Sequence, residues 1–206
     1  MAADSTIPVE QHPLEPFLPA NGKVLMLGSF PPQLKRWAKD FYFYYPNFTN
    51  DMWRVMGLVF FGDALHFVDT KRKTYRQEEI VAFLNEKGIG IYDTACAVRR
   101  LQDNASDKFL EVVTPTDIRA LLARMPQCRA IVTTGQKATD TICQYFDIEQ
   151  PKMGEHATFT LTDPATGEPK TGYLYRLPST SRAYPLSLQK KAEAYRRMFE
   201  ELQMHA

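Results

Sequence analysis

Three short segments of the sequence hold residues that could act on a bound ligand. In the first, Gly28 to Pro31, the glycine and the serine can offer backbone N–H groups and allow close approach. The second holds Tyr45, whose ring can stack on a flat ligand, and Asn50, whose carboxamide can orient a water or donate from its NH2 group. The third, Ser179 to Arg182, carries hydroxyl, backbone and guanidinium donors that suit phosphate.

The same residues also have purely structural readings. Asn50 is a good helix N-cap, and Tyr45 lies in the aromatic cluster 41–45, where packing in the core is the commoner role. The first segment fits an ordinary turn at a strand end, and the third fits a capped Pro-Ser turn. Trp53 is expected in the core, beneath any pocket that these segments form. Both sets of readings stay open on the sequence alone.

Several familiar catalytic signatures are absent from the sequence. It has no GxGxxG, no P-loop, no HExxH and no GxSxG. The four histidines form no spaced set, and the three cysteines include no CxxC, so zinc and iron–sulfur sites are not expected. The odd number of cysteines argues against a disulfide framework and favours a reducing cytoplasm.

Strand and helix signals alternate along the chain and leave the first and third segments in loops. Buried strands are predicted over 23–28, 89–93, 129–134 and 173–177, and helices over 76–87, 117–125, 136–146 and 187–203, with a further helix starting near Asn50. Residues 151–171 are expected to form a hairpin or a long loop. The long connections predict a parallel sheet covered by helices on both faces, with a binding crevice at the carboxyl ends of its strands.

Length and composition fit one domain with its own core. The chain has 206 residues, of which 44% are hydrophobic and 24% charged, and its net charge of +1 excludes a protein that coats nucleic acid by charge alone. The Pro-rich residues 1–22 are predicted to form an extended arm, and residues 23–206 the domain. Because no signal peptide is recognised and the most apolar stretch, 56–68, is too short to span a bilayer, we expect a soluble, cytoplasmic protein that does not bind membranes.

The motifs, in their order along the chain, resemble those of the uracil-DNA glycosylase superfamily, and most of all its hypoxanthine-DNA glycosylase branch. The segments that carry the resemblance are Gly28–Ser–Phe–Pro31, Tyr44–Tyr45 with Asn50–Asp–Met–Trp53, Gly88–Ile–Gly–Ile–Tyr–Asp93, and Leu177–Pro–Ser–Thr–Ser–Arg–Ala183. The mismatch-specific uracil/thymine glycosylases are the nearest relatives of that branch. They carry a water-activating asparagine where this chain has Phe30, and the hypoxanthine branch also lacks it.

The resemblance implies a three-layer α/β/α sandwich around a four-stranded, mostly parallel sheet. It implies a monofunctional DNA glycosylase that hydrolyses the bond between deoxyribose and a deaminated or mismatched base, of hypoxanthine or uracil type, in base-excision repair. The enzyme would work as a monomer on a base flipped out of damaged DNA, without metal or organic cofactor. The implied site residues are Asn50 for catalysis; Gly28, Ser29, Phe30, Pro31 and Tyr45 for the base; and Ser179, Thr180, Ser181 and Arg182 for DNA.

Two functions of other classes remain open at this point. One is a non-catalytic nucleic-acid-binding module on the same scaffold, and the other is a hydrolase of free nucleosides or nucleotides. The formation of abasic sites in damaged duplex DNA separates the glycosylase from both.

Overall fold

The computed structural model describes residues 7–102, 107–163 and 165–204, and a five-stranded sheet forms its centre. The strand order is β5 (Ile89–Asp93), β2 (Val24–Gly28), β8 (Ala130–Thr133), β10 (Pro169–Arg176) and β9 (His156–Thr162). The first four strands run parallel, and β9 pairs antiparallel with β10. The continuous apolar runs of β2, β5 and β8 suit strands that are buried on both faces of a sheet.

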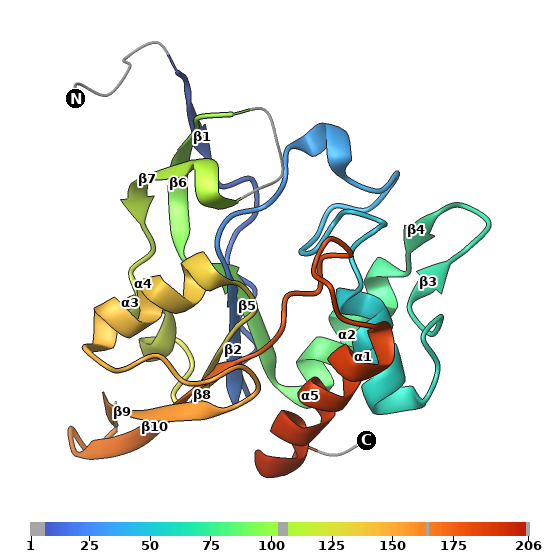
Figure 1. The fold of residues 1–206 in the computed structure, drawn as a ribbon. Coiled ribbons are helices and arrows are strands. Elements are labelled where there is room, and N and C mark those ends of the chain that lie inside the picture. Colours follow the sequence, from blue (N-terminus) through green and yellow to red (C-terminus); the bar gives the residue numbers. More distant parts are fainter. Residues whose placement is uncertain (1–6, 103–106, 164, 205–206) are drawn as a thin grey trace.

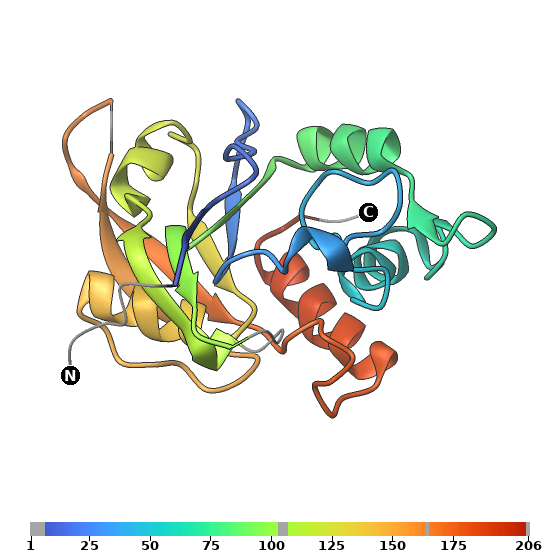
Figure 2. The same cartoon turned by 90° about the horizontal axis from the view of Figure 1, so that it is seen from above.

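Helices cover both faces of this sheet, which confirms the predicted three-layer α/β/α arrangement (Figures 1 and 2). On one side lie α1 (Met52–Phe61), α2 (Gln77–Lys87) and α5 (Leu188–Glu201), and on the other lie α3 (Ile118–Ala123) and α4 (Gln136–Phe146). All of the predicted helices are therefore present, within a few residues of the predicted bounds.

The sheet differs from the prediction by one strand. The four predicted strands are β2, β5, β8 and β10, and the fifth, β9, arises within residues 151–171 as the hairpin partner of β10. Along β9, buried Phe159 and Leu161 alternate with exposed threonines, which is the pattern of an edge strand with one face against the core. The sheet remains mostly parallel, as expected.

Two smaller β structures lie outside the central sheet. β1 (Val9–Gln11), β6 (Ala95–Arg100) and β7 (Leu110–Pro115) form an antiparallel sheet in the order β1-β6-β7, and β3 (Val68–Asp69) pairs with β4 (Thr74–Tyr75). Short 3-10 turns occupy Leu34–Arg36 and Asp107–Phe109. Through β1, the N-terminal segment lies beside β6, next to the loop that follows β2.

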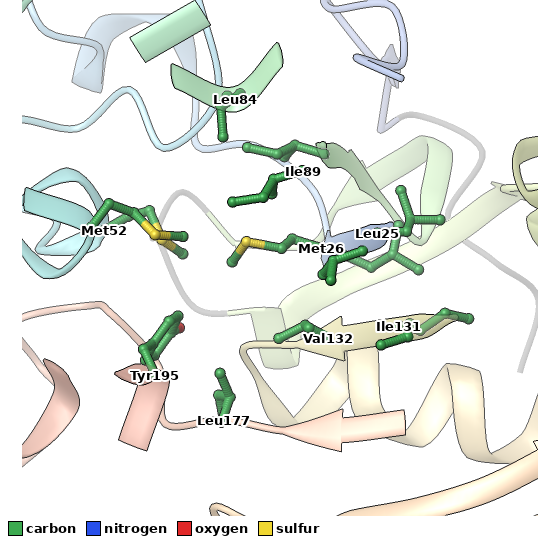
Figure 3. Close-up of a cluster of buried hydrophobic side chains, with 14 of the residues drawn as sticks. Leu25, Met26, Met52, Leu84, Ile89, Ile131, Val132, Leu177 and Tyr195 are labelled. Atoms are coloured by element: carbon green, nitrogen blue, oxygen red, sulfur yellow. The ribbon is translucent and has the colours of Figure 1, made fainter. Parts of the chain in front are cut away.

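The core between the central strands and the helices is built from aliphatic side chains that the apolar runs predicted (Figure 3). Leu25 and Met26 from β2 and Ile131 and Val132 from β8 are fully buried. Met52, Leu84 and Tyr195, from α1, α2 and α5 respectively, close over the same side of the sheet. This core fixes the ends of the strands from which the loops leave.

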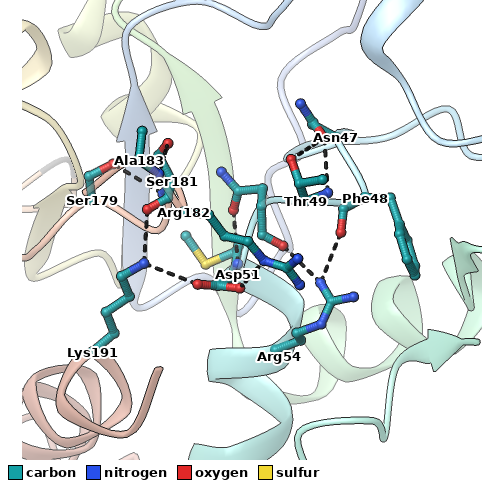
Figure 4. A network of polar contacts seen from close by, with 12 residues as sticks. Asn47, Phe48, Thr49, Asp51, Arg54, Ser179, Ser181, Arg182, Ala183 and Lys191 are labelled. Atoms are coloured by element: carbon teal, nitrogen blue, oxygen red, sulfur yellow. Dashed lines mark hydrogen bonds and ion pairs between the residues drawn. The ribbon is translucent and has the colours of Figure 1, made fainter. Parts of the chain in front are cut away.

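A buried ion pair joins α5 to the start of α1 (Figure 4). Lys191 Nζ, in a side chain that is 1% exposed, lies 3.0 Å from Asp51 Oδ2 and donates a second hydrogen bond, of 2.9 Å, to Ser181 O. The other oxygen of Asp51 accepts from Arg182 Nε at 3.2 Å, and the Asp51 N–H donates to Thr180 O at 2.8 Å. The residue after Asn50 is thus bound to the loop that follows β10.

We expect Lys191→Met to lower the free energy of unfolding by about 3 kcal/mol, because it leaves the carboxylate of Asp51 buried with only Arg182 opposite. Adding Asp51→Asn should recover part of this loss. The matched control is Lys190→Met, a change at the exposed neighbouring lysine, which should stay within about 0.5 kcal/mol of the wild type. Chemical denaturation measures all three, and equal effects at the two lysines would contradict the structural role of the ion pair.

Candidate active site

A cavity of about 500 Å³ opens where the loops leave the carboxyl ends of β2, β5 and β8. Ligand sites in proteins usually measure about 300–1,000 Å³. Every site residue named from the sequence lines this cavity: Gly28, Ser29, Phe30, Pro31, Tyr45, Asn50, Ser179, Thr180, Ser181 and Arg182. The fold therefore brings the three segments together, while the role of each residue stays a prediction.

The carboxamide of Asn50 is held in one orientation. Asn50 Oδ1 accepts the backbone N–H of Met52 at 2.9 Å, so the NH2 group is left for the cavity. The backbone carbonyl of Asn50 accepts from Tyr75 Oη at 2.9 Å and from Arg54 Nη1 at 3.1 Å. Asp51, rather than Asn50, occupies the N-cap position of α1, although the Oδ1 contact satisfies one of the first free N–H groups of the helix.

Tyr45 lies in the cavity wall with a strained backbone. Its φ of 52° falls in the left-handed region, which is costly for a residue with a Cβ and is often retained at functional sites. The phenol oxygen lies 3.3 Å from Thr134 Oγ1, and burial raises the pKa of this phenol, so the hydroxyl stays neutral. The ring meets Trp53 edge-on at 6.2 Å. Trp53 is fully buried, which confirms its predicted place in the core.

The loop after β2 forms a second wall of the cavity. A Cβ at Gly28 would lie 2.4 Å from Asp93 Oδ1, so a larger residue at this position would have to displace the Asp93 carboxylate. Ser29 is 7% exposed, and its hydroxyl lies beside the carboxyl group of Asp107. Phe30 is buried, and the carbonyl of Pro31 accepts from Arg100 Nη2 at 3.1 Å.

The loop after β10 folds back on itself through its own hydroxyls (Figure 4). Ser179 Oγ accepts the N–H of Ser181 at 3.2 Å, and Ser181 Oγ accepts the N–H of Ala183 at 3.2 Å. Together with the contacts to Asp51 and Lys191, these bonds give the loop a fixed shape. Arg182, whose side chain is 52% exposed, stands at the rim of the cavity.

The prediction from sequence missed a polar pair at the edge of the cavity, in which Asp93 lines the cavity and His12 lies behind it. His12 Nε2 lies 2.9 Å from Asp93 Oδ2, and both side chains are at least nine-tenths buried. The ring of His12 packs against Tyr92 at 4.6 Å and edge-on against Phe30 at 5.3 Å. In the sequence Asp93 is only the end of a strand motif, and a lone histidine in an N-terminal segment gives no signal of its own.

Asp107 is a second carboxyl group that lines the cavity and was not predicted. Burial raises its pKa, an effect that the nearby Ser29 hydroxyl and the Lys137 and Arg100 cations partly offset. Arg100 is itself paired with Glu10 of β1 at 3.0 Å. The cavity therefore combines two carboxyl groups with four cationic side chains, Arg100, Lys108, Lys137 and Arg182.

The described residues contain no cluster of three or more His, Cys, Asp or Glu side chains placed to hold a metal ion. Cys96, Cys128 and Cys143 are free thiols. Over the same ranges, the helices lack the length and apolar character needed to cross a membrane.

Comparison with known proteins gives a match at the level of structure. No family model and no curated protein sequence matches the chain. Among solved structures, the chain is similar to the solution NMR structure of a protein from Methanosarcina acetivorans described as a putative uracil DNA glycosylase. The two share 22% identity and a TM-score of 0.59, over 94% of this chain and 99% of that one. This chain therefore has the fold of that protein over nearly its whole length.

Proposed function

We propose that the protein is a monofunctional DNA glycosylase, which hydrolyses the N-glycosidic bond of a deaminated base, of uracil or hypoxanthine type, in base-excision repair. The observation that carries the proposal is the convergence of Tyr45, Asn50 and the loop 28–31 on one cavity at the strand ends. The solved structure of the same fold, described as a putative uracil DNA glycosylase, supports this class of reaction. We further propose that the protein works as a monomer in the cytoplasm.

The cavity suits a base that has left the duplex. A base stacked in DNA keeps its glycosidic carbon out of reach of a side chain, so the enzyme must flip the nucleotide into a pocket. The ring of Tyr45 in the wall can replace the stacking that the base gives up. Its neutral hydroxyl is directed to Thr134, which keeps the ring fixed in the wall.

The reaction breaks the bond between C1′ and the base nitrogen, and the electron pair leaves with the base. Water forms the new bond to C1′ and releases a proton. Negative charge grows on the base while positive charge grows on the sugar, so donors aimed at the base stabilise the transition state. The NH2 group of Asn50 is such a donor, because the Met52 N–H already holds the oxygen of this carboxamide.

The loop 178–183 offers the DNA-facing groups. Because the backbone of this loop already has a fixed shape, no entropy is lost in ordering it when DNA binds. Arg182 at the rim can pair with a phosphate. The net charge of +1 is consistent with few phosphate contacts around one flipped nucleotide rather than a long basic track.

The proposal is tested with labelled duplexes that carry uracil, hypoxanthine, xanthine or a thymine mismatch, each incubated with the protein and then treated with alkali. We expect strand breaks at one or more of the deaminated bases, and only after the alkali step. Breaks without alkali would contradict the monofunctional assignment. Duplex binding without abasic sites would favour a non-catalytic module, and turnover of free nucleosides would favour the other alternative.

Asn50→Ala should reduce single-turnover excision by about 10²–10³-fold, the usual effect of removing one positioned donor from a developing charge. The loss of the Met52 contact should lower stability by only about 1 kcal/mol, so the variant stays folded. Asn85→Ala, on the exposed side of α2, is the matched control and should excise at the wild-type rate. Near-normal excision by folded Asn50→Ala would refute the assignment.

Tyr45→Ala should slow excision by about 10–100-fold, because base–aromatic stacking is worth about 1–3 kcal/mol. Tyr45→Phe keeps the ring, loses only the contact to Thr134, and should keep most of the activity. Thermal unfolding of both variants supplies the control. A large loss of stability in Tyr45→Ala, with unchanged activity of the folded fraction, would mean that the ring serves the core rather than the base.

A further inference from the structure

The two edges of the central sheet differ in what lies beside them. At one edge, the N-terminal segment covers β5, where Phe17 and Ile91 exchange backbone hydrogen bonds of 3.1 and 2.8 Å. At the other edge lies β9, and among the described residues its only strand partner is β10. The sheet therefore has one closed edge and one open edge, and the open edge belongs to the orange hairpin in Figure 1.

The hydrogen bonds at the two ends of this hairpin show which backbone groups of β9 face outward. The N–H of Asp163 donates to Glu168 O, and the N–H of Arg176 donates to Glu155 O. Bonded and non-bonded residues alternate along an antiparallel ladder, so the odd-numbered residues of β9 bond to β10. The groups that face away from β10 belong to His156, Thr158, Thr160 and Thr162. Within the described part of the chain, no backbone hydrogen bond reaches them.

β9 lacks the features that usually keep an open edge from pairing with another strand. Edge strands are commonly protected by lysines, prolines, inward-pointing charges or β-bulges. The seven residues of β9 read His-Ala-Thr-Phe-Thr-Leu-Thr, with no lysine, proline or acidic residue, and their register with β10 runs without a bulge. This edge is therefore a regular template for a further strand.

A second cavity, of about 300 Å³, opens beside the same edge. Leu161 and Lys170, which both line it, are cross-strand partners in β9 and β10, so their side chains lie on one face of the sheet. Met125 and Phe146, at the ends of α3 and α4, form further walls. The cavity is thus mainly apolar and has room for a large side chain. It lies near the start of β10, at the opposite end of the sheet from the candidate active site.

Two cations stand at this cavity, Arg119 and Lys170. The exposed Arg119 guanidinium lies 5.9 Å from the ring centre of Tyr145, and Lys170 Nζ donates to Pro126 O at 2.9 Å. The described residues that line the cavity include no carboxyl group. An apolar pocket with two cations suits an apolar side chain that has acidic neighbours. A second copy of this chain would bring its own two cations to the same face of the joined sheet, so charge favours a different, acidic partner.

We propose that the β9 edge and the second cavity form a docking site for an extended, acidic segment of a partner protein. The segment adds to the sheet as a strand and bonds to the outward backbone groups of Thr158 and Thr160. Its side chain opposite Leu161 enters the cavity. Acidic residues two positions before and after that side chain lie on the same face of the sheet and pair with Arg119 and Lys170. The inference does not depend on the proposed function, because this site is separate from the candidate active site.

A labelled peptide of sequence Thr-Glu-Thr-Leu-Val-Glu-Thr tests the proposal on the wild-type protein by fluorescence anisotropy. Its leucine is the cavity side chain, and its glutamates share the leucine's face. We expect saturable binding. Replacing the leucine by alanine should weaken binding by about 10-fold, and replacing both glutamates by lysine by at least about 10-fold. N-methylation of the two residues beside the leucine, whose N–H groups would bond to β9, should weaken it by at least about 10-fold.

Variants of the protein test the same contacts from the other side. Thr160→Pro removes an outward N–H and spares the ladder to β10, and Ala123→Trp places a ring in the cavity, so each should weaken binding of the acidic peptide by at least about 10-fold. Arg119→Glu combined with Lys170→Glu should make the lysine peptide the tighter ligand. Arg124→Glu, an exposed change at the end of α3 outside the cavity, is the matched control and should bind as the wild type does. Thermal unfolding shows which variants are folded.

The wild-type measurements decide the proposal even where a variant fails to fold. No saturable binding of the acidic peptide up to about 1 mM would overturn it. Equal binding of the acidic and the lysine peptide, or of the N-methylated and the unmodified peptide, would also overturn it. A dimer of the protein alone that sedimentation detects and that Thr160→Pro abolishes would assign the edge to a second copy of this chain, against the acidic partner proposed.

Discussion

The buried carboxylate of Asp51 is the constraint on which the candidate site depends. A charge in this position needs partners, and it finds them in Lys191 of α5 and Arg182 of the loop after β10. Replacing such a pair by apolar groups often leaves stability unchanged. The main effect of this ion pair is therefore to fix the positions of α1, α5 and the loop after β10 relative to one another. Because Asn50 directly precedes Asp51, the contacts that satisfy the charge also fix the carboxamide beside the loop 178–183. One set of bonds therefore holds α1, the loop 178–183 and the catalytic candidate Asn50 together.

The sequence predicts most of the central fold because its signals are local. Apolar runs ending at Gly28 and Asp93 indicate buried parallel strands, and Asp117 and Ser187 accept N–H groups at the starts of α3 and α5 as capping residues do. The small sheet β1-β6-β7 has no comparable signal. β1 spans only Val9–Gln11, its side chains are mostly exposed, and its pairing with β6 crosses most of the N-terminal half of the chain. Such a contact is set by tertiary structure.

The candidate site was predictable where its residues belong to loops at strand ends, since the carboxyl ends of parallel strands meet at one edge. The loops after β2 and β10 could be chosen in this way, whereas Asn50 and Tyr45 were chosen because their segment resembles a glycosylase motif. His12 and Asp93 could not be predicted as a pair, because 81 positions separate them and the residues around each of them give no sign of a site. Their pairing depends on the path of the N-terminal segment over β5, where Phe17 bridges Ile91. Which atom of Asn50 faces the cavity also follows only from the contact to Met52.

The central claim is that a deaminated base leaves the duplex and enters this cavity. Its most direct test is the fluorescence of 2-aminopurine placed next to a non-hydrolysable 2′-fluoro-deoxyuridine in a duplex, titrated with the wild-type protein. The account predicts a rise in fluorescence as the neighbouring base unstacks, a much smaller rise with Tyr45→Ala, and none when cytosine replaces uracil. Saturable binding to the uracil duplex with no change in fluorescence would contradict it, because the base would then have stayed in the stack.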